Sequence, residues 1–428
     1  MSITIPTLMR NQKAGRNTHT MATQLICSQM PVIGIHSSSC SADEEKEASN
    51  RGDIVLKKIP NLNKINDGKR LYYNPNSNEK AVFNNIKKEF EGKFNIQLTS
   101  RDLIIKQLIA TLTHGDYINY SIPDINLVII RSDIKNFYPS INKHELYRKI
   151  SRTNILSNST IEILKPMFFS KSVLGVPLGL PFSSVLAEIY LERFDLDIYS
   201  NFTPTFYFRY VDDLIIIKYD MITKLDLETE RKCLEGIFAK HSLAINRSKT
   251  NVTSYFGNSE LSFNYLGYQF NSSGGKLIIS ISEEKIIKIE NKIKQHFYTF
   301  KKSNRSRKQF WILYYKVMNS IYGITSVDKG GKIMHFGLGY SYRFINDENQ
   351  VIELIKLVKG LIFSCKLSSN QTSTLLHLVS YEGEAIKILQ KRYDYTALSA
   401  KQMSKIKNRL CLGTKSCNIS RIFYVIYK

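Results

Sequence analysis

Two patterns of apolar residues alternate along the chain, and they predict two kinds of secondary structure. Short unbroken apolar runs are typical of strands, whereas apolar residues spaced three or four apart predict helices. Strands are expected at 54–56, 71–73, 127–130, 206–210 and 214–217, followed by a hairpin over 263–270. Helices are expected over 79–113, 142–170, 183–194, 224–241 and 283–302, and the remainder to Lys428 is expected to be mostly helical.

Two pairs of predicted strands are joined by short polar segments. Asp67-Gly68 lies in the basic segment 64–70 between the first two strands, and this dipeptide favours a hairpin turn because both residues tolerate positive φ. Val211-Asp212-Asp213 lies at the tip of the hairpin formed by 206–210 and 214–217. We therefore expect one basic hairpin and one acidic hairpin.

Asp133, Asp212 and Asp213 are the candidate reactive groups. Asp133 follows the apolar run 127–130, with only two polar residues between them. Asp212 and Asp213 are adjacent in the chain, and adjacent carboxylates prefer to be solvated or to share a cation. An ordinary Asp-Asp turn is the alternative. On neighbouring antiparallel strands, these side chains could hold two Mg²⁺ ions about 3.5 to 4 Å apart, the arrangement used for in-line attack on a phosphate.

The overall charge indicates a polyanionic partner. The chain of 428 residues has 60 Lys and Arg against 37 Asp and Glu, a formal net charge of +23. Such an excess attracts nucleic acid, although it distinguishes neither DNA from RNA nor binding from catalysis. No segment approaches the ~18 to 20 continuous apolar residues of a membrane span. The six cysteines form no CxxC pair, and the N-terminus does not resemble a signal peptide, so we expect a cytoplasmic protein with reduced thiols.

Both ends of the chain have a distinctive composition. Residues 1–50 are rich in Ser, Thr and Asn, and we expect them to be partly mobile or to dock on a partner. Residues 385–428 contain ten Lys and Arg and one acid, interleaved with aromatic residues. Basic residues neutralise phosphates and aromatic rings can stack on bases, so this region and the 283–302 helix are expected to bind structured RNA. The alternative is a helical bundle with a basic solvated face.

Five segments, taken together and in order, resemble the motifs of reverse transcriptases. The resemblance covers residues 54 to about 330 and is closest to the bacterial group that includes retron and group II intron enzymes. Asp133–Ile141 resembles motif A, 175–191 motif B, Tyr210–Asp213 (YVDD) motif C, Leu243–Thr250 motif D, and Tyr265–Tyr268 motif E, the primer grip.

The resemblance implies an α+β fold of the right-hand polymerase type. Its palm would be an antiparallel sheet with helices on one face. The implied regions are an N-terminal extension at 1–50, fingers at 51–125, a palm at 126–272 with finger helices inserted at 142–180, a thumb at 273–330 and a basic helical region at 331–428. The implied activity is RNA-directed DNA polymerisation with two Mg²⁺ ions.

The resemblance also assigns roles to residues around the acids. Asp133 and Asp212 would be the principal metal ligands, and Asp213 the third acid. Lys249 lies where the family has a lysine able to protonate pyrophosphate. Tyr138 lies at the steric-gate position, where a ring would collide with a ribonucleotide 2′-hydroxyl. A core tyrosine and a solvated lysine are the alternatives.

The implied nucleotide-binding residues include one departure from the family. Lys69 and Arg70 lie on the fingers hairpin, whose basic residues contact the incoming triphosphate in relatives. Leu178 and Gly179 stand in motif B, where most relatives have Pro-Gln-Gly and this chain has Pro177-Leu178-Gly179. Leucine cannot donate a hydrogen bond to the nucleotide. Several bacterial enzymes linked to phage defence and abortive infection also lack that glutamine.

Four functions fit these features. The one we favour is a defence-associated reverse transcriptase that acts with a non-coding RNA and deoxynucleoside triphosphates to make DNA, alone, as a homo-oligomer or with a partner protein. A mobile-element reverse transcriptase is the second, although no His/Cys-rich endonuclease module follows residue 330. An RNA-dependent RNA polymerase is disfavoured by Tyr138 and Tyr210. A polymerase-derived RNA-binding scaffold is the fourth, and the three retained acids argue against it.

Overall fold

The computed structural model describes residues 56–428 except 69, 220–226, 257–258, 329–330 and 414–417. The predicted N-terminal extension and residue Lys69 therefore lie outside the described residues. Within the described part of the chain, no helix is both long and apolar enough to cross a membrane. Cys233, Cys365 and Cys411 are the described cysteines, and none of them forms a disulfide within the described residues.

A four-stranded antiparallel sheet with the order β4-β5-β3-β6 forms the centre of the fold. Its strand β3 is fully apolar until it reaches its polar end, and alternate residues point to opposite faces. Leu127 and Ile129 enter one hydrophobic core, whereas Val128 and Ile130 enter the other. The sheet therefore separates two cores. The strands are β3 (Leu127–Asp133), β4 (Phe206–Tyr210), β5 (Asp213–Tyr219) and β6 (Asn251–Tyr255).

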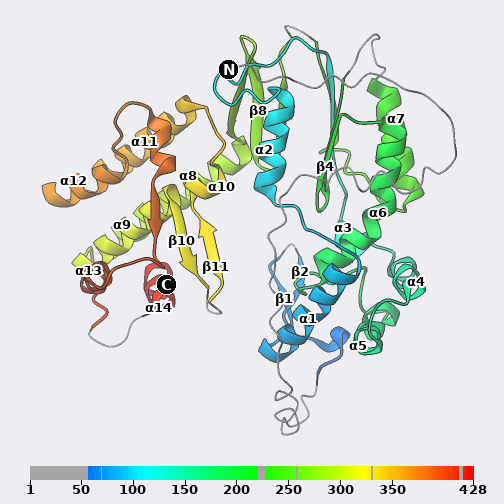
Figure 1. The fold of residues 1–428 in the computed structure, drawn as a ribbon. Helices are drawn as coiled ribbons and strands as arrows, with labels where there is room; N and C mark the ends of the chain where they lie inside the picture. The colour runs from blue at the N-terminus through cyan, green and yellow to red at the C-terminus, as the bar shows by residue number, and fades with distance from the viewer. Residues whose placement is uncertain (1–55, 69, 220–226, 257–258, 329–330, 414–417) are drawn as a thin grey trace, which may run out of the picture. The chain divides into compact units, whose positions relative to one another are not determined.

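Both faces of this sheet are covered, rather than one face as the sequence predicts. Helices α1 (Ser77–Lys93), α6 (Ser183–Phe202) and α7 (Leu227–Lys240) contribute to the core on one side. Helix α2 (Arg101–Leu112) and a second sheet contribute to the core on the other, and Figure 1 shows α2 beside β8. The second sheet has the order β7-β8-β9, with bounds Ser262–Tyr265, Tyr268–Ser273 and Lys276–Ile281.

The N-terminal elements differ from the prediction in two places. β2 (Leu71–Tyr73) pairs with β1 (Lys64–Asn66), because Asp67-Gly68 forms a tight turn that pairs its immediate neighbours. Of the strand expected at 54–56, only Leu56 lies within the described residues, and it is not in a strand. The expected helix over 79–113 is two helices, since the side chain of Ser100 accepts a hydrogen bond from Leu103 N and starts α2 anew. The remaining elements here are η2 (Ile59–Asn61), α3 (Phe137–Ser140), α4 (Lys143–Thr153) and α5 (Asn158–Phe169).

The C-terminal part contains a three-stranded sheet that the sequence does not predict. Strand β10 pairs antiparallel with β11 and parallel with the distant β12. These strands are β10 (Gly323–Val327), β11 (Ile333–Phe336) and β12 (Arg392–Asp394). The helices are α8 (Glu283–Lys302), α9 (Arg307–Ile321), α10 (Leu338–Ser341), α11 (Glu348–Phe363), α12 (Ser369–Leu378), η3 (Ala385–Gln390), α13 (Ala400–Leu410) and α14 (Ile419–Tyr427).

His296 on α8 is expected to make stability pH-dependent. Burial, reinforced by Lys316 and Lys292, lowers the pKa of His296 from 6.5 to about 4. The unfolded chain therefore takes up a proton below pH 6.5 that the folded chain refuses until about pH 4. This stability is present above pH 6.5 and is lost as the pH falls, by about 2 kcal/mol at pH 5.

We expect His296→Gln to lose less stability than the wild type between pH 7.5 and pH 5, as measured by urea unfolding at each pH. Identical losses in the two proteins would show that His296 stays exposed to protonation in the folded state.

Candidate active site

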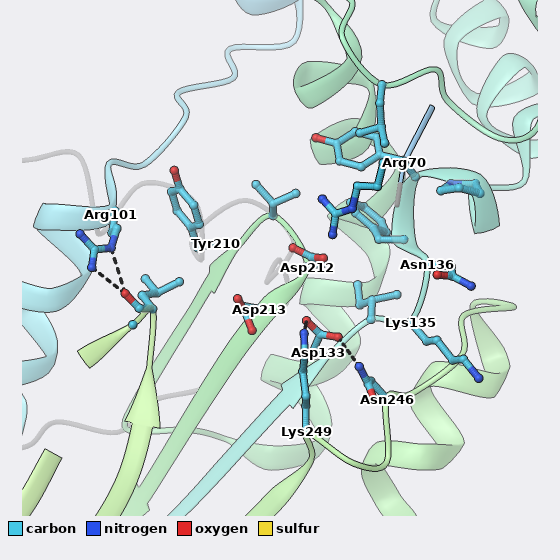
Figure 2. Close-up of a pocket in the computed structure, with 18 of the residues that line it drawn as sticks. Arg70, Arg101, Asp133, Lys135, Asn136, Tyr210, Asp212, Asp213, Asn246 and Lys249 are labelled. Atoms are coloured by element: carbon cyan, nitrogen blue, oxygen red, sulfur yellow. Dashed lines mark hydrogen bonds and ion pairs between the residues drawn. The ribbon is translucent and has the colours of Figure 1, made fainter. Parts of the chain in front are cut away.

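A cavity of about 1360 Å³ opens above the end of the central sheet. Its wall is formed by the fingers hairpin, the end of β3, the β4–β5 turn, the β7–β8 turn and the start of α8. Segments far apart in the sequence thus meet at one site, where carboxylate, amide and basic side chains gather (Figure 2). The cavity is large enough for a nucleotide and the end of a nucleic acid strand.

The three predicted acids come together at the floor of this cavity. Asp133 at the end of β3 is paired with Asp213 at the start of β5. Tyr210 pairs with Asp213, so Val211 and Asp212 form the turn between β4 and β5. One carboxylate oxygen from each of the three acids lies within 4.8 Å of the others, and the side chains point toward one another (Figure 2).

Burial and the neighbouring negative charges raise the pKa values of Asp212 and Asp213. Burial, reinforced by Asp133 and Asp212, raises the pKa of Asp213 to about 6. Burial also raises the pKa of Asp212, with a further contribution from Asp133. Asp213 Oδ1 is buried without a hydrogen-bond partner, and the nearest cationic group is Arg131 Nη2 at 3.9 Å. A group of hard oxygen donors that repel one another fits a divalent cation such as Mg²⁺.

Asp133 is held by two side chains of the turn that precedes β6. Asn246 Nδ2 donates to Asp133 Oδ1 at 2.8 Å, and Lys249 Nζ lies 2.9 Å from Asp133 Oδ2 (Figure 2). The backbone N–H of Asn246 also donates to the Asp133 carbonyl at 2.9 Å. The structure thus places the predicted Lys249 beside the triad. Asn246 lies in the segment that resembles motif D, but our sequence analysis gave it no role of its own.

The predicted nucleotide-binding residues are only partly brought together. Arg70, Tyr138 and Leu178 line the cavity, and Arg70 projects toward Asp212 (Figure 2). Burial, followed by the charge of Asp212, raises the pKa of Tyr138 to about 12. Gly179 lies away from the cavity, with φ of 92°, and a Cβ there would stand 2.4 Å from the carbonyl oxygen of Tyr73.

The motif B loop joins the fingers hairpin to the segment that carries Tyr138. Tyr73 N donates to the Leu178 carbonyl at 2.7 Å, and Val176 N donates to the Tyr138 carbonyl at 2.9 Å. A Cβ on Gly175, where φ is 54°, would stand 2.0 Å from that same Tyr138 oxygen. The glycines of this loop therefore allow close approach of protein backbones.

Comparison with protein families assigns the core of the chain. Residues 82–270, somewhat less than half of the sequence, match the family described as reverse transcriptase (RNA-dependent DNA polymerase). This segment is similar to reverse transcriptase domains. It contains the three acids, the motif B loop and the β7–β8 turn.

The solved structures similar to this chain include fungal telomerases. Telomerase from Candida albicans, in complex with a TWJ fragment of telomeric RNA, has 11% identity and a TM-score of 0.38 over 69% of this chain and 56% of that one. Apo telomerase from Candida tropicalis has 14% identity and a TM-score of 0.34 over 81% of this chain and 60% of that one. This chain therefore spans less than two thirds of the length of either. No curated protein sequence matches it.

The reverse transcriptase domain confirms the predicted fold class and the class of enzyme. The observed helices and antiparallel sheets are those of an α+β fold of the right-hand polymerase type. The domain indicates an RNA-directed DNA polymerase, a nucleotidyltransferase. Reverse transcriptase domains use divalent metal ions, and the Asp133, Asp212 and Asp213 group is suited to bind one.

Proposed function

We propose that this chain extends a DNA strand on an RNA template by phosphoryl transfer with two Mg²⁺ ions, held by Asp133, Asp212 and Asp213. The observation that carries this proposal is the convergence of three carboxylates within 4.8 Å at the floor of a cavity. Two Mg²⁺ ions would lower the pKa of a primer 3′-hydroxyl and neutralise the triphosphate and the leaving pyrophosphate.

The chain's own residues would orient these ligands and bind the substrate. Asn246 fixes one oxygen of the Asp133 carboxylate, so that the other oxygen keeps its direction. Lys249, whose side chain is 52% exposed, can leave Asp133 and donate a proton to pyrophosphate. Arg70 would bind the triphosphate, because a guanidinium fork matches phosphate geometry. Lys69 keeps its predicted role in the same contact.

Tyr138 would exclude ribonucleotides, and this role gives a testable prediction. Its ring is half-buried at the cavity wall near Asp212. Tyr138→Ala should raise the relative kcat/KM for ribonucleotides by about 10- to 100-fold, the range for losing a steric contact. Tyr138→Phe keeps the ring and is the matched control, which should retain wild-type selectivity. Equal selectivity in wild type and Tyr138→Ala would show that Tyr138 is a packing residue only.

Leu178 gives the nucleotide site an apolar wall where most relatives have an amide. Its backbone is fixed by the bond from Tyr73 N, so its side chain is presented at the cavity by a rigid loop. An apolar wall cannot form a hydrogen bond with the incoming nucleotide. We propose that this site selects nucleotides by shape and by pairing with the template.

We further propose that the physiological role is bacterial antiviral defence with an associated non-coding RNA. We also propose that the chain is divided into fingers, palm, thumb and a basic C-terminal region with the bounds given above. The basic C-terminal region supports an RNA partner, although its aromatic residues differ in exposure. Tyr395 is buried, whereas Tyr424 is 61% and Tyr427 42% exposed. Stacking on RNA bases is therefore expected from Tyr424 and Tyr427, with Lys428 lying over the Tyr424 ring.

The partner RNA can be identified directly from the purified protein. The wild type and the Asp212→Ala, Asp213→Ala double variant would be incubated with Mg²⁺ and labelled deoxynucleotides, and the bound nucleic acid sequenced. The proposal expects DNA complementary to one co-purified RNA in the wild type alone. DNA unrelated to any bound RNA would contradict RNA templating, and absence of product with RNA still bound would favour an RNA-binding scaffold.

A further inference from the structure

The geometry points to Arg209 as a positioning residue that holds the Tyr210–Asp213 turn in the conformation that brings Asp212 to the metal site. This inference rests on the proposed function, because it assigns the metal ligands as above. Arg209 lies on β4 and is not among the residues that line the cavity. Its action would therefore pass through the backbone of the turn.

The Arg209 guanidinium is almost completely buried and forms hydrogen bonds through all three of its nitrogen atoms. Its side chain is 5% exposed. It donates to Asp195 through Nε at 2.9 Å and Nη2 at 2.8 Å, and to Glu188 through both Nη atoms. The remaining bond is from Nη1 to the carbonyl oxygen of Val211 at 2.9 Å. A single guanidinium thus links helix α6 to the tip of the β4–β5 turn.

The tip of the turn is in a conformation that its residue type disfavours. Val211 has φ of 61°, in the left-handed region that β-branched residues rarely adopt. Such a conformation is strained for a β-branched residue and persists only where surrounding contacts determine it. The bond from Arg209 is directed at the carbonyl of this strained residue, which precedes Asp212 in the chain.

Two further contacts fix the backbone of the turn at Asp212 and Asp213. Ile134 N donates to the Asp212 carbonyl at 3.0 Å, and the buried Tyr265 hydroxyl lies 3.3 Å from the Asp213 carbonyl. The peptide on each side of Asp212 is therefore fixed, one by Arg209 and one by Ile134, the residue after β3. Loss of the Arg209 bond would let the Val211 peptide rotate, which moves the Asp212 carboxylate relative to Asp133.

Only an arginine can make this set of bonds. Glu188 and Asp195 lie seven positions apart on α6, two turns along one face, and the planar fork reaches both acids and the Val211 carbonyl. A lysine keeps the charge but offers three donors from one point. Arg209→Lys should therefore keep the ion pair with α6 while losing the bond that fixes the turn.

Mg²⁺ titration tests this inference with a readout independent of activity. The Mg²⁺-dependent rise in Tm and the Mg²⁺ dependence of nucleotide incorporation would be measured for wild type, Arg209→Lys and Glu188→Gln. Arg193→Lys, an exposed arginine on the same helix, is the matched control. Arg209→Lys is expected to need about 10- to 100-fold more Mg²⁺ in both measurements, the usual effect of removing a residue that orients a metal ligand.

Glu188→Gln is a milder second variant, because Asp195 still pairs with Arg209, and it tests the inference if Arg209→Lys fails to fold. It should raise the Mg²⁺ requirement by a smaller factor than Arg209→Lys. Adding Val211→Gly to Arg209→Lys should recover part of the Mg²⁺ affinity, because glycine adopts positive φ without strain. If Arg209→Lys and Glu188→Gln both fold and both show the same Mg²⁺ dependence as the wild type, the inferred role of Arg209 is overturned. If Asp212→Asn also matched the wild type in Mg²⁺ binding and activity, the proposed function itself would fail.

Discussion

Replacing Asp212 by Asn is expected to reduce nucleotide incorporation by at least about 10³-fold, equivalent to about 4 kcal/mol of transition-state stabilisation. The amide keeps the size of the carboxylate but removes a negative charge from the group that would bind Mg²⁺. Asp212 lies in the two-residue turn between β4 and β5, so no neighbouring acid can take its place without moving the backbone. Initial rates of deoxynucleotide incorporation at saturating Mg²⁺ measure the effect.

The control for this substitution is Asp124→Asn, which changes an exposed acid outside the cavity lining and should leave the rate unchanged. Thermal unfolding without Mg²⁺ would show that Asp212→Asn is folded, and removing one of three repelling carboxylates should raise rather than lower its Tm. A folded Asp212→Asn protein with more than a tenth of the wild-type rate would contradict the metal-ligand role.

Arg209→Met is expected to have the largest effect on stability, about 3 kcal/mol of the free energy of unfolding. Methionine fills much of the same volume but leaves Glu188 and Asp195 without their cation. The Val211 carbonyl also loses its donor. Equilibrium urea unfolding in the absence of Mg²⁺ gives the difference directly.

A second variant separates charge from packing in this network. Adding Glu188→Gln and Asp195→Asn to Arg209→Met removes the two unpaired charges and should restore about half of the lost free energy, because unpaired buried charge is the main penalty. A loss below about 0.5 kcal/mol in Arg209→Met would show that the two acids are adequately solvated without the arginine.

The sequence is most informative where a local pattern has one structural meaning. The apolar run at 127–130 predicts a buried strand, and the strand continues to Asp133 because β5 pairs with it that far, whereas β6 pairs with it only to Arg131. The YVDD segment predicts a hairpin tip, and β4 and β5 pair around it in that register. Helix 283–302 is also confirmed with its predicted limits, since acidic residues begin it and Ser303 ends it.

What the sequence does not predict depends on contacts between distant residues. The pairing of β10 with β12 joins segments that lie far apart in the chain, and strands of three to five residues give too little alternation to be recognised. Asn246 and Arg209 contact partners elsewhere in the chain, so their individual roles could not be predicted locally, although Asn246 lies in the motif D segment. Gly175 and Gly179 are explained by the backbones that approach them, which only the fold reveals.

Extension of a DNA primer on a defined RNA template tests the central claim most directly. Wild type and the Asp212→Ala, Asp213→Ala double variant would be given Mg²⁺, labelled deoxynucleotides and a primed RNA whose sequence fixes the order of addition. The account predicts that the wild type makes the complementary DNA and that the double variant makes none. Equal extension by both proteins would show that these aspartates are not the catalytic metal ligands, and extension by the wild type only on DNA templates would contradict RNA-directed synthesis.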